Sequence, residues 1–423
     1  MDELKSVSKP FDISMVEVRA AWEKVRGNKG AAGVDGVSVE VFERDLENNL
    51  YKIWNRMSSG TYFPPVVKAV AIPKSDGGTR VLGVPSVGDR VAQTVVATHL
   101  MDRVEKVFHP DSYGYRPGRS ALDAVESCRV RCWKYDWVVE FDIRKFFDSV
   151  PWDKVVAAVG AHTDARWVVL YVKRWLAAGL RLPDGSVVER ALGTPQGSAV
   201  SPVLANLFLH YAFDVWMVRE FPGCPFERYA DDAVVHCGTL AQAREVLSAL
   251  RSRMAEVGLE LHPDKTRIVY CKDDNRPEKF DHIEFTFLGY TFRPRSAQNR
   301  YGKRFASFLP AVSAKAMKRM SATVHDWGLH RRTDLEYADL RRMVNPVVRG
   351  WMTYYGRFYH SALAPLLYRI NTYVLRWVMK KYRLTWKEAG LRLTLRHTLS
   401  PRSLAHWKWA PPANGPIRAT RAV

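Results

Sequence analysis

The sequence predicts an α+β fold in which strands and amphipathic helices share one large chain. Short runs of β-branched and aromatic residues, bounded by Gly, Pro and Asp, predict strands and tight hairpins. Apolar residues at alternating steps of three and four predict helices, which dominate the last third of the chain. With 423 residues and 47% hydrophobic composition, the chain can bury a substantial core and form several structural units.

The first strong strand pattern is a hairpin over residues 66–85. Its turn is residues 75–78, and the flanking runs are rich in Val, Ile and Leu. Lys74 and Arg80 stand on either side of the turn and are expected to face each other on the two strands. Two neighbouring cations either hold an anion between them or protect an exposed strand edge, and the pattern leaves both interpretations open.

A helix is predicted over residues 87–107, followed by a loop rich in Tyr and Arg, residues 112–120, which includes Arg116. Such a loop offers a stacking and phosphate-binding surface. Residues 137–143 then predict a buried strand that ends near the acid Asp142. A carboxylate at the end of a buried strand needs a partner because an unpaired buried charge is costly, and a metal ion would satisfy it.

Two adjacent acids, Asp231 and Asp232, stand at the bend of a second predicted hairpin, residues 226–237. Asp favours turns through bonds from its side chain to the backbone, so the pair alone is typical of a turn. A functional interpretation needs a third carboxylate, and Asp142 supplies one. Gln196 lies in a preceding Gly/Pro turn, where it either contacts a nucleotide or is an ordinary surface residue.

The last third of the chain is helical and strongly basic. Residues 301–423 contain 23 Lys and Arg but 5 Asp and Glu, so they carry most of the formal charge of +20. A basic face interleaved with Trp and Tyr favours nucleic acid over an ordinary solvated surface. The segment after residue 399 contains prolines and is expected to be loosely ordered. Four arginines lie off the apolar stripe of the predicted helix near residues 340–358: Arg341, Arg342, Arg349 and Arg357.

Neither a membrane partner nor a disulfide framework is expected. No run approaches about 18 uninterrupted apolar residues, and the first residues carry no apolar signal segment. The five cysteines have no paired spacing, and we interpret them as reduced thiols. These features predict a cytoplasmic protein.

Five short motifs follow one another in a specific order. They are Phe141-Asp142-Ile143, Thr194-Pro195-Gln196-Gly197, Tyr229-Ala230-Asp231-Asp232, the segment from Gly258-Leu259 to Lys265, and Phe287-Leu288-Gly289-Tyr290. The ordered set resembles the motif series of reverse transcriptases, most closely those encoded by bacterial group II introns. Arg349-Gly350-Trp351 with Tyr354-Tyr355 is similar to the maturase region of that family.

The resemblance implies a right-hand polymerase with fingers, a palm built on an antiparallel sheet, and a helical thumb. The implied domains are an N-terminal extension (1–65), reverse transcriptase fingers and palm (66–295), a helical thumb or maturase domain (305–385) and a short basic C-terminal tail (386–423). It also implies an RNA-directed DNA polymerase that copies intron RNA into cDNA and a maturase that assists splicing and mobility. The implied partners are group II intron RNA, an RNA template with a DNA primer, deoxynucleoside triphosphates (dNTPs) and target DNA.

The same resemblance assigns roles to individual residues. Two Mg²⁺ ions, with Mn²⁺ as a substitute, would be held by three carboxylates: Asp142, Asp231 and Asp232. The nucleotide would contact Lys74, Arg80, Phe147, Gln196 and Lys265, with the bulk of Phe147 excluding a 2′-hydroxyl. The primer would contact Phe287, Leu288, Gly289 and Tyr290, and the RNA would contact Arg116, Arg341, Arg342, Arg349 and Arg357.

The chain departs from the family pattern in two ways, and other functions share its motifs. No nuclease motif with Cys and His ligands follows the thumb region, and the segment after Tyr382 is short, so neither second-strand cleavage nor a full DNA-binding domain is expected. One alternative is a non-catalytic RNA-binding splicing factor. A second is an RNA-dependent RNA polymerase, which the bulk of Phe147 disfavours. A third is a host-adapted reverse transcriptase for defence or repair, which has the same residues.

Overall fold

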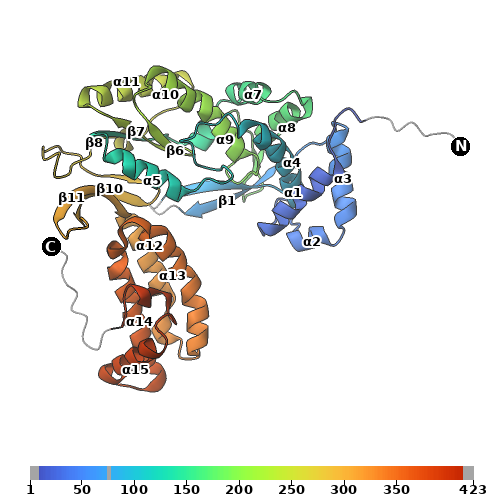
Figure 1. Cartoon of the computed structure of the whole chain (residues 1–423). Coiled ribbons are helices and arrows are strands. Elements are labelled where there is room, and N and C mark those ends of the chain that lie inside the picture. Colours follow the sequence, from blue (N-terminus) through green and yellow to red (C-terminus); the bar gives the residue numbers. More distant parts are fainter. Residues whose placement is uncertain (1–8, 74–77, 413–423) are drawn as a thin grey trace. The chain divides into compact units, whose positions relative to one another are not determined.

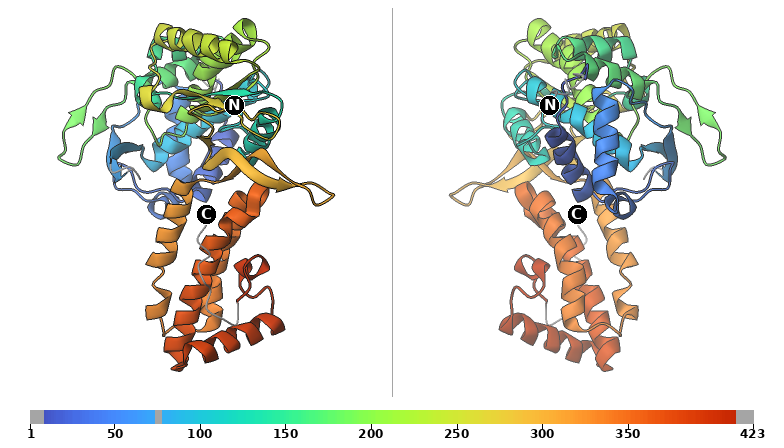
Figure 2. Two further views of the ribbon diagram at one scale, coloured as in Figure 1. Left: turned by 90° about the vertical axis from the view of Figure 1, so that its left-hand side faces the viewer. Right: turned by 90° about the vertical axis from the view of Figure 1, so that its right-hand side faces the viewer.

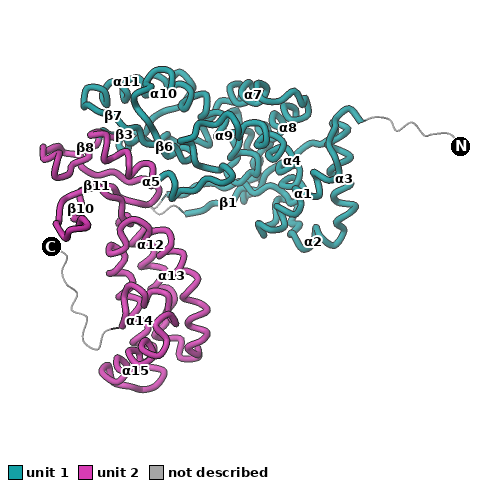
Figure 3. The backbone as a smooth tube through the Cα atoms, in the orientation of Figure 1, with its two compact units in different colours: residues 1–124, 139–268 teal, residues 125–138, 269–423 magenta. Residues whose placement is uncertain are grey.

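The chain forms two compact units in a computed structural model that describes residues 9–73 and 78–412 (Figure 1, Figure 3). Unit 1 comprises the described residues of 1–124 and 139–268, and unit 2 comprises those of 125–138 and 269–423. Helices and strands occur in both units, which confirms the mixed α and β class predicted from the sequence.

Most of the elements before residue 266 belong to unit 1. They are α1 (Met15–Gly27), α2 (Val39–Glu43), α3 (Leu46–Ser58), β1 (Val67–Pro73), β2 (Thr79–Val84), α4 (Val87–Val104), α6 (Phe146–Ser149), α7 (Trp152–Gly160), α8 (Arg166–Leu176), β4 (Leu180–Arg181), β5 (Val187–Val188), α9 (Ser201–Leu209), the π-helix η1 (His210–Asp214), α10 (Val215–Glu220), β6 (Phe226–Tyr229), β7 (Asp232–Cys237), α11 (Leu240–Glu256) and the 3₁₀ turn η2 (Pro263–Lys265). Three further elements contain the points of division: α5 (Ala121–Cys132), β3 (Trp137–Asp142) and β8 (Arg267–Tyr270).

Two four-stranded sheets organise this part of the chain. The first has the order β2-β1-β4-β5 and the second the order β6-β7-β3-β8. Strands β1 and β2 pair antiparallel, from Lys68 opposite Val84 to Pro73 opposite Thr79, which confirms the hairpin predicted over residues 66–85. Strands β6 and β7 also pair antiparallel, which confirms the second predicted hairpin.

The N-terminal helices form because local capping and apolar spacing agree. Ser14 caps α1 and exchanges hydrogen bonds with Glu17, the reciprocal arrangement that satisfies the first backbone donors of a helix. Trp22, on the buried face of α1, is fully buried and stacks on Phe42 of α2 with 5.1 Å between ring centroids. This burial makes the first three helices part of the core of unit 1.

Unit 2 combines a three-stranded sheet with a group of helices. The sheet has the order β11-β10-β9, and both of its strand pairs are antiparallel. Helix α14 contacts both α12 and α15. In Figure 2 the dark red helix α15 lies across the ends of the longer orange helices. The elements are β9 (Phe285–Phe287), β10 (Tyr290–Gln298), β11 (Arg304–Val312), α12 (Ala314–Asp326), η3 (Leu329–Arg331), α13 (Tyr337–Tyr359), η4 (His360–Leu363), α14 (Ala364–Tyr382), α15 (Trp386–Leu399) and η5 (Ala405–Lys408).

The segment after α15 differs from its sequence prediction, because it is packed through residue 410. Trp407 and Ala410 are buried in unit 2. The side-chain amide of Asn345 donates to the carbonyl of Ser403, and that of Asn371 donates to the carbonyl of Ala410. The prolines suggested looseness, but Leu404, Trp407 and Ala410 are buried and fix the segment to unit 2.

Two expectations about thiols and membranes concern the whole chain. All five cysteines lie among the described residues, and each is buried and forms no disulfide. No helix among the described residues has the length and apolar character needed to cross a membrane.

Candidate active site

The two acids lie where β6 turns into β7. Tyr229 pairs with Asp232, so Ala230 and Asp231 form a two-residue turn, and Ala230 takes a left-handed conformation with φ of 58°. A non-glycine residue in this conformation costs roughly 1–2 kcal/mol, so the surroundings must hold the turn in place.

A buried ion pair lies beneath this turn and supplies that support. The Arg228 guanidinium donates from Nε and Nη2 to the two carboxylate oxygens of Asp214, both at 2.6 Å, and neither side chain is more than 1% exposed. Its Nη1 donates to the carbonyl of Ala230 at 3.1 Å and to Oδ1 of Asn206 at 2.9 Å. Arg228 therefore fixes the turn through its backbone, with Asp214 placed by the π-helix η1.

The loop before α5 closes the turn from another side. The backbone of Tyr113 donates to the carbonyl of Arg228 at 2.8 Å. A Cβ added at Gly114 would lie 2.4 Å from the backbone nitrogen of Ala230, so only glycine allows this approach. The backbone of the acidic turn is thus held by three separate parts of unit 1.

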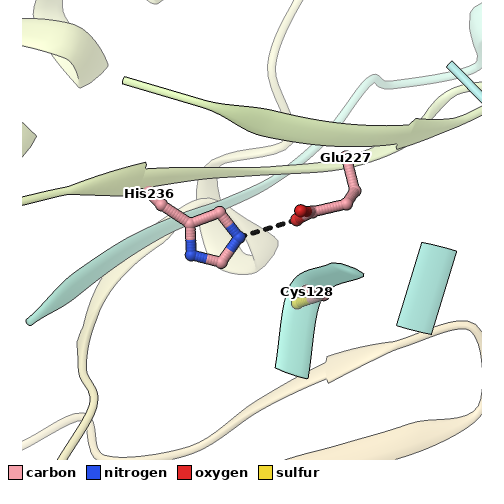
Figure 4. Close-up of side chains that lie close together, drawn as sticks. All are labelled: Cys128, Glu227 and His236. Atoms are coloured by element: carbon pink, nitrogen blue, oxygen red, sulfur yellow. Dashed lines mark hydrogen bonds and ion pairs between the residues drawn. The ribbon is translucent and has the colours of Figure 1, made fainter. Parts of the chain in front are cut away.

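A second buried pair links the two strands of the hairpin. Nε2 of His236 lies 2.6 Å from Oε2 of Glu227, and both side chains are fully buried (Figure 4). A one-residue slip of β6 against β7 would turn Glu227 to the opposite face and separate this pair. The pair therefore specifies the register that brings Asp231 to the bend.

The third acid, Asp142, ends β3, the strand next to β7 in the sheet. Its carbonyl accepts from the backbone of His262 at 2.8 Å, and its carboxylate accepts from Nζ of Lys265 at 2.9 Å. The side chain is 39% exposed. The structure thus joins two residues that lie more than 120 positions apart and that the sequence placed in one site.

The acids of the turn and of β3 influence each other. The pKa of Asp231 is raised, chiefly by burial and further by the negative charge of Asp142, while Arg228 and Lys265 oppose the rise. A divalent cation bound between the two carboxylates would offset the repulsion between their negative charges. Carboxylate oxygens are also the ligands that Mg²⁺ prefers. The donor set fits such an ion, although among the described residues the three acids are not all within 4.8 Å of one another.

The residues expected at the nucleotide come from neighbouring loops of unit 1. The backbone of Gly83 on β2, the strand of Arg80, donates to the carbonyl of Gln196 at 2.7 Å. The backbone of Thr194 donates to the carbonyl of Phe147 at 2.7 Å. The structure therefore joins the segments that carry three of the predicted residues, while Lys74 lies outside the described residues.

Asp89 and Gln93 support the Gln196 loop, and the sequence analysis did not identify them. Oε1 of Gln93 accepts from the hydroxyl of Ser198 at 2.7 Å and from the backbone of Ala199 at 2.8 Å. Nε2 of Gln93 donates to Asp89, and burial raises the pKa of this carboxyl to about 6. Both residues lie on α4, so a polar pair spaced four apart on an otherwise apolar helix face was the available signal.

Tyr115 is a further residue near the acids that the sequence analysis did not single out. Burial raises its pKa, the charge of Asp231 raises it further, and the charge of Arg80 lowers it. The phenol therefore interacts electrostatically with both Asp231 of the acidic turn and Arg80 of β2. It is 48% exposed, so it remains accessible to a substrate.

Arg116, which the sequence analysis predicts to bind RNA, is held inside the protein in this structure. Its side chain is 4% exposed and forms an ion pair with Glu105 at 2.7 Å. Its Nη1 donates to the carbonyls of His109 and Ser112, both at 2.7 Å. The guanidinium of Arg116 thus stabilises the loop that contains it. The abundance of Tyr and Arg in the sequence does not reveal this structural role.

The predicted primer contact lies in unit 2 as a tight turn between β9 and β10. Leu288 and Gly289 have φ of 51° and 81°, the two positive values that a type I′ hairpin turn requires. Phe287 and Tyr290 are fully buried, so their side chains cannot touch a primer. Tyr354 of α13 donates to the carbonyl of Leu288 at 2.9 Å, which anchors the turn. Any primer contact here is limited to the turn itself.

The remaining arginines predicted to bind RNA lie on one helix of unit 2. All are exposed on α13, and Arg342 pairs with Asp339 at 2.5 Å. Their positions are Arg341, Arg342, Arg349 and Arg357. Helix α13 therefore has exposed arginines off its apolar stripe, as the sequence pattern predicted.

A strand-end acid beside an acidic hairpin turn is typical of metal-dependent nucleotidyl transfer. Residues 72–292 match the family model described as reverse transcriptase (RNA-dependent DNA polymerase), and residues 317–393 match the group II intron, maturase-specific domain. The first match covers more than half of the chain. The chain belongs to the reverse transcriptase family and carries the maturase domain of group II intron proteins.

Three relatives show how far the likeness extends. Protein YkfC of Escherichia coli strain K12 is 31% identical over 330 residues, 68% of this chain and 83% of that protein. The uncharacterized 91 kDa protein in the cob intron of Schizosaccharomyces pombe is 24% identical over 434 residues, 84% of this chain and 51% of that protein. The group II intron-encoded protein LtrA of Lactococcus lactis subsp. cremoris is 30% identical over 191 residues, 45% of this chain and 32% of that protein.

This chain thus spans about half of the cob intron protein and about a third of LtrA. The matches confirm the predicted resemblance to group II intron reverse transcriptases and the predicted enzyme class, RNA-directed DNA polymerase. The reverse transcriptase domain implies dependence on a divalent metal ion, and the two domains together imply binding of intron RNA and nucleic acid substrates.

Proposed function

We propose that this chain copies group II intron RNA into cDNA from a DNA primer and that its basic helical domain assists splicing and mobility of the intron. One observation carries the catalytic half of the proposal. Asp231 of the acidic turn and Asp142 of β3 are close enough for one charge to raise the pKa of the other, inside the segment that matches the reverse transcriptase family. Two such carboxylates are poised for a divalent cation.

The proposed ligands are Asp142, Asp231 and Asp232. Two Mg²⁺ ions bound there would stabilise the attacking and leaving oxygens of an in-line displacement at phosphorus. Lys265 now neutralises Asp142, and its side chain is 60% exposed. We assign its ammonium group to the phosphates of the nucleotide, because a flexible and exposed cation can leave one anion for another.

The nucleotide pocket is assigned to Arg80, Phe147 and Gln196, with Lys74 as a further phosphate contact. The hydrogen bonds between β2 and the Gln196 loop, and between the Thr194 and Phe147 segments, support a single pocket. Phe147 is half-buried in α6, and its bulk would stand against a 2′-hydroxyl. This assignment makes the product DNA and the substrates dNTPs.

The remaining assignments follow the predicted domains. Residues 66–295 would provide fingers and palm, residues 305–385 the thumb or maturase domain, and residues 1–65 an extension. The Leu288–Gly289 turn would contact the primer, and the exposed arginines of α13 would contact intron RNA. Target DNA would be a further partner during mobility.

Primer extension tests the catalytic half. The wild-type protein is expected to extend a DNA primer on an RNA template with dNTPs and Mg²⁺ or Mn²⁺. Asp231→Asn should abolish extension, whereas Asp184→Asn, a change of an exposed acid in the β4–β5 loop, should leave it intact. Extension by Asp231→Asn at the wild-type rate would refute the assignment of the acids.

The sugar selectivity of extension separates this enzyme from an RNA-dependent RNA polymerase. Phe147→Ala should raise incorporation of ribonucleotides, and the ratio of kcat/KM for ribonucleotides and dNTPs measures the change. Phe146→Leu is the matched control, since Phe146 is 2% exposed and packs into the core. An unchanged ratio in Phe147→Ala would remove the gate assignment.

A splicing assay separates the maturase half from the polymerase half. If RNA binding by α13 is independent of catalysis, Asp231→Asn should still support splicing of a group II intron RNA that the wild-type protein helps to splice. Replacing Arg341 and Arg349 together should weaken splicing while primer extension on an unrelated template continues. Equal loss of both activities in Asp231→Asn would overturn an independent maturase role.

A further inference from the structure

A basic groove lies in unit 2 between α13 and the segment that follows α15. It encloses a cavity of about 300 Å³, at the lower end of the volumes of small-ligand pockets. We call it the Trp409 groove. Its lining includes Arg349, Met352, Thr353, Arg402, Lys408 and Trp409.

The three cations of the groove have no acidic partner in the described part of the chain. Arg349, Arg402 and Lys408 are exposed, and no ion pair or hydrogen bond of these side chains occurs among the described residues. Every acid between residues 301 and 412 is engaged elsewhere. The pairs are Asp326 with His325, Asp334 with Arg332, Glu336 with Lys381, Asp339 with Arg342, and Glu388 with Thr385. Three cations around one cavity repel one another unless an anion joins them.

The groove is built in advance, because buried polar contacts hold its outer wall. Oδ1 of Asn345 accepts from the backbone of Ala405 at 2.9 Å, and Oδ1 of Asn371 accepts from the indole of Trp407 at 2.9 Å. The hydroxyl groups of Tyr337 and Ser403 lie 2.9 Å apart. These bonds place Arg402 and Lys408 opposite the face of α13 that carries Arg349.

The groove also offers a ring on which a base can stack. Trp409 is half-buried, and its ring contacts that of His360 with 5.4 Å between centroids. Stacking on a tryptophan contributes about 1–3 kcal/mol per base in single-strand binding proteins. Thr353 adds a hydroxyl that can donate to or accept from a polar edge. Cations, an aromatic ring and a hydroxyl together match a nucleotide.

We propose that the Trp409 groove binds one unpaired nucleotide of the intron RNA. Its phosphate contacts Arg349, Arg402 and Lys408, and its base lies on Trp409. The site rests on the proposed maturase function and extends it, because the maturase match ends at residue 393 and the outer wall of the groove lies beyond it. A duplex does not fit this chemistry, since its bases stack on one another inside the helix.

RNA affinity as a function of salt concentration tests the proposal. The probes are labelled oligoadenylate and a fully paired, blunt-ended RNA duplex. Changing Arg402 and Lys408 together to Ala should flatten the slope of log affinity against log salt for oligoadenylate by up to about 0.7, which is the contribution of one phosphate contact for single strands. Changing Lys380 and Lys387 to Ala removes the same charge from exposed positions outside the groove and should change the slope by less than half as much.

A second variant tests the groove without removing a cation. Thr353→Glu places a carboxylate among the three cations and is expected to weaken oligoadenylate binding on the order of tenfold. Thr353→Gln, of similar size and without charge, is the control and should retain most of the affinity. Equal losses in the groove and control pairs, or equal losses for oligoadenylate and the paired duplex, would overturn the proposal.

Primer extension on the same preparations keeps this inference separate from the proposed function. The groove residues belong to unit 2, whereas the proposed catalytic acids belong to unit 1. Extension by the groove variants should match the wild type on a short template. Absence of extension by the wild-type protein would refute the proposed polymerase activity. Unchanged RNA binding by the groove variants would refute the proposed nucleotide site in the Trp409 groove.

Discussion

Removing the charge of Asp214 should destabilise the hairpin that carries Asp231 and Asp232, the proposed catalytic acids. Asp214→Asn keeps the shape of the side chain but leaves the guanidinium of Arg228 buried at 1% exposure without a negative partner. Breaking one partner of a buried ion pair typically costs about 3–5 kcal/mol. We expect a cost near the upper end of this range, because Asp214 accepts two hydrogen bonds of 2.6 Å from the same guanidinium.

Native-state hydrogen exchange of the β6 and β7 amides measures this cost locally. The free energy of opening should fall by about 3–5 kcal/mol in Asp214→Asn. Glu227→Gln, which alters the other buried pair of the same hairpin, is the control for general loss of stability (Figure 4). A change below about 1 kcal/mol in Asp214→Asn would refute the reasoning, since it would equal that of an exposed pair.

A double variant separates stability from positioning. Asp214→Leu with Arg228→Met removes both charges, and such apolar replacements are often neutral or stabilising. The free energy of opening should therefore recover. The rate of primer extension should remain about a hundredfold low, because the carbonyl of Ala230 has lost its donor and a displacement of about 1 Å has this effect. Recovery of the rate together with stability would show that Arg228 does not position the turn.

Three other predictions concern unit 1 and the β9–β10 turn. Because burial raises the pKa of Asp89 to about 6 from 3.8, its ionisation disfavours the folded state. The difference in unfolding free energy between wild type and Asp89→Asn should thus fall by about 3 kcal/mol as the pH rises from about 4 to 6 and stay constant above, as measured by urea titration at each pH. Gly114→Ala should lower primer extension about a hundredfold with normal circular dichroism, since its Cβ would meet the backbone of Ala230. Gly289→Ala should destabilise the β9–β10 turn by about 1–2 kcal/mol in hydrogen exchange, because its φ is 81°.

The features that local patterns determine were the ones that the sequence predicted well. Both hairpins followed from β-branched runs around a polar turn, and the structure has both. The pair of Asp142 and Lys265 was placed in one site by the family motifs, not by spacing, since they lie 123 residues apart. Local rules do not constrain contacts at such distances, so the resemblance carried this part of the site.

The residues that the sequence missed or misplaced share one physical feature, which is burial of a polar group. Arg228 stands between Glu227 and Tyr229 in a strand and gave no sign that it would be buried with Asp214. Arg116 was expected to contact RNA, but it is buried with Glu105. Charge in a sequence indicates exposure on average, and it fails where a fold supplies a partner from another element.

The two cations near the proposed catalytic acids, Arg228 and Lys265, differ in how firmly they are held. Both lower the pKa of Asp231, which burial and Asp142 raise. Arg228 is buried and bonded on all sides, so its charge is a permanent part of the turn. Lys265 is 60% exposed and makes a single bond to Asp142, so it can exchange that carboxylate for a phosphate. The acidic turn therefore has one buried, fixed charge in Arg228 and one exposed charge in Lys265, which on the proposed assignment would move from Asp142 to a substrate phosphate.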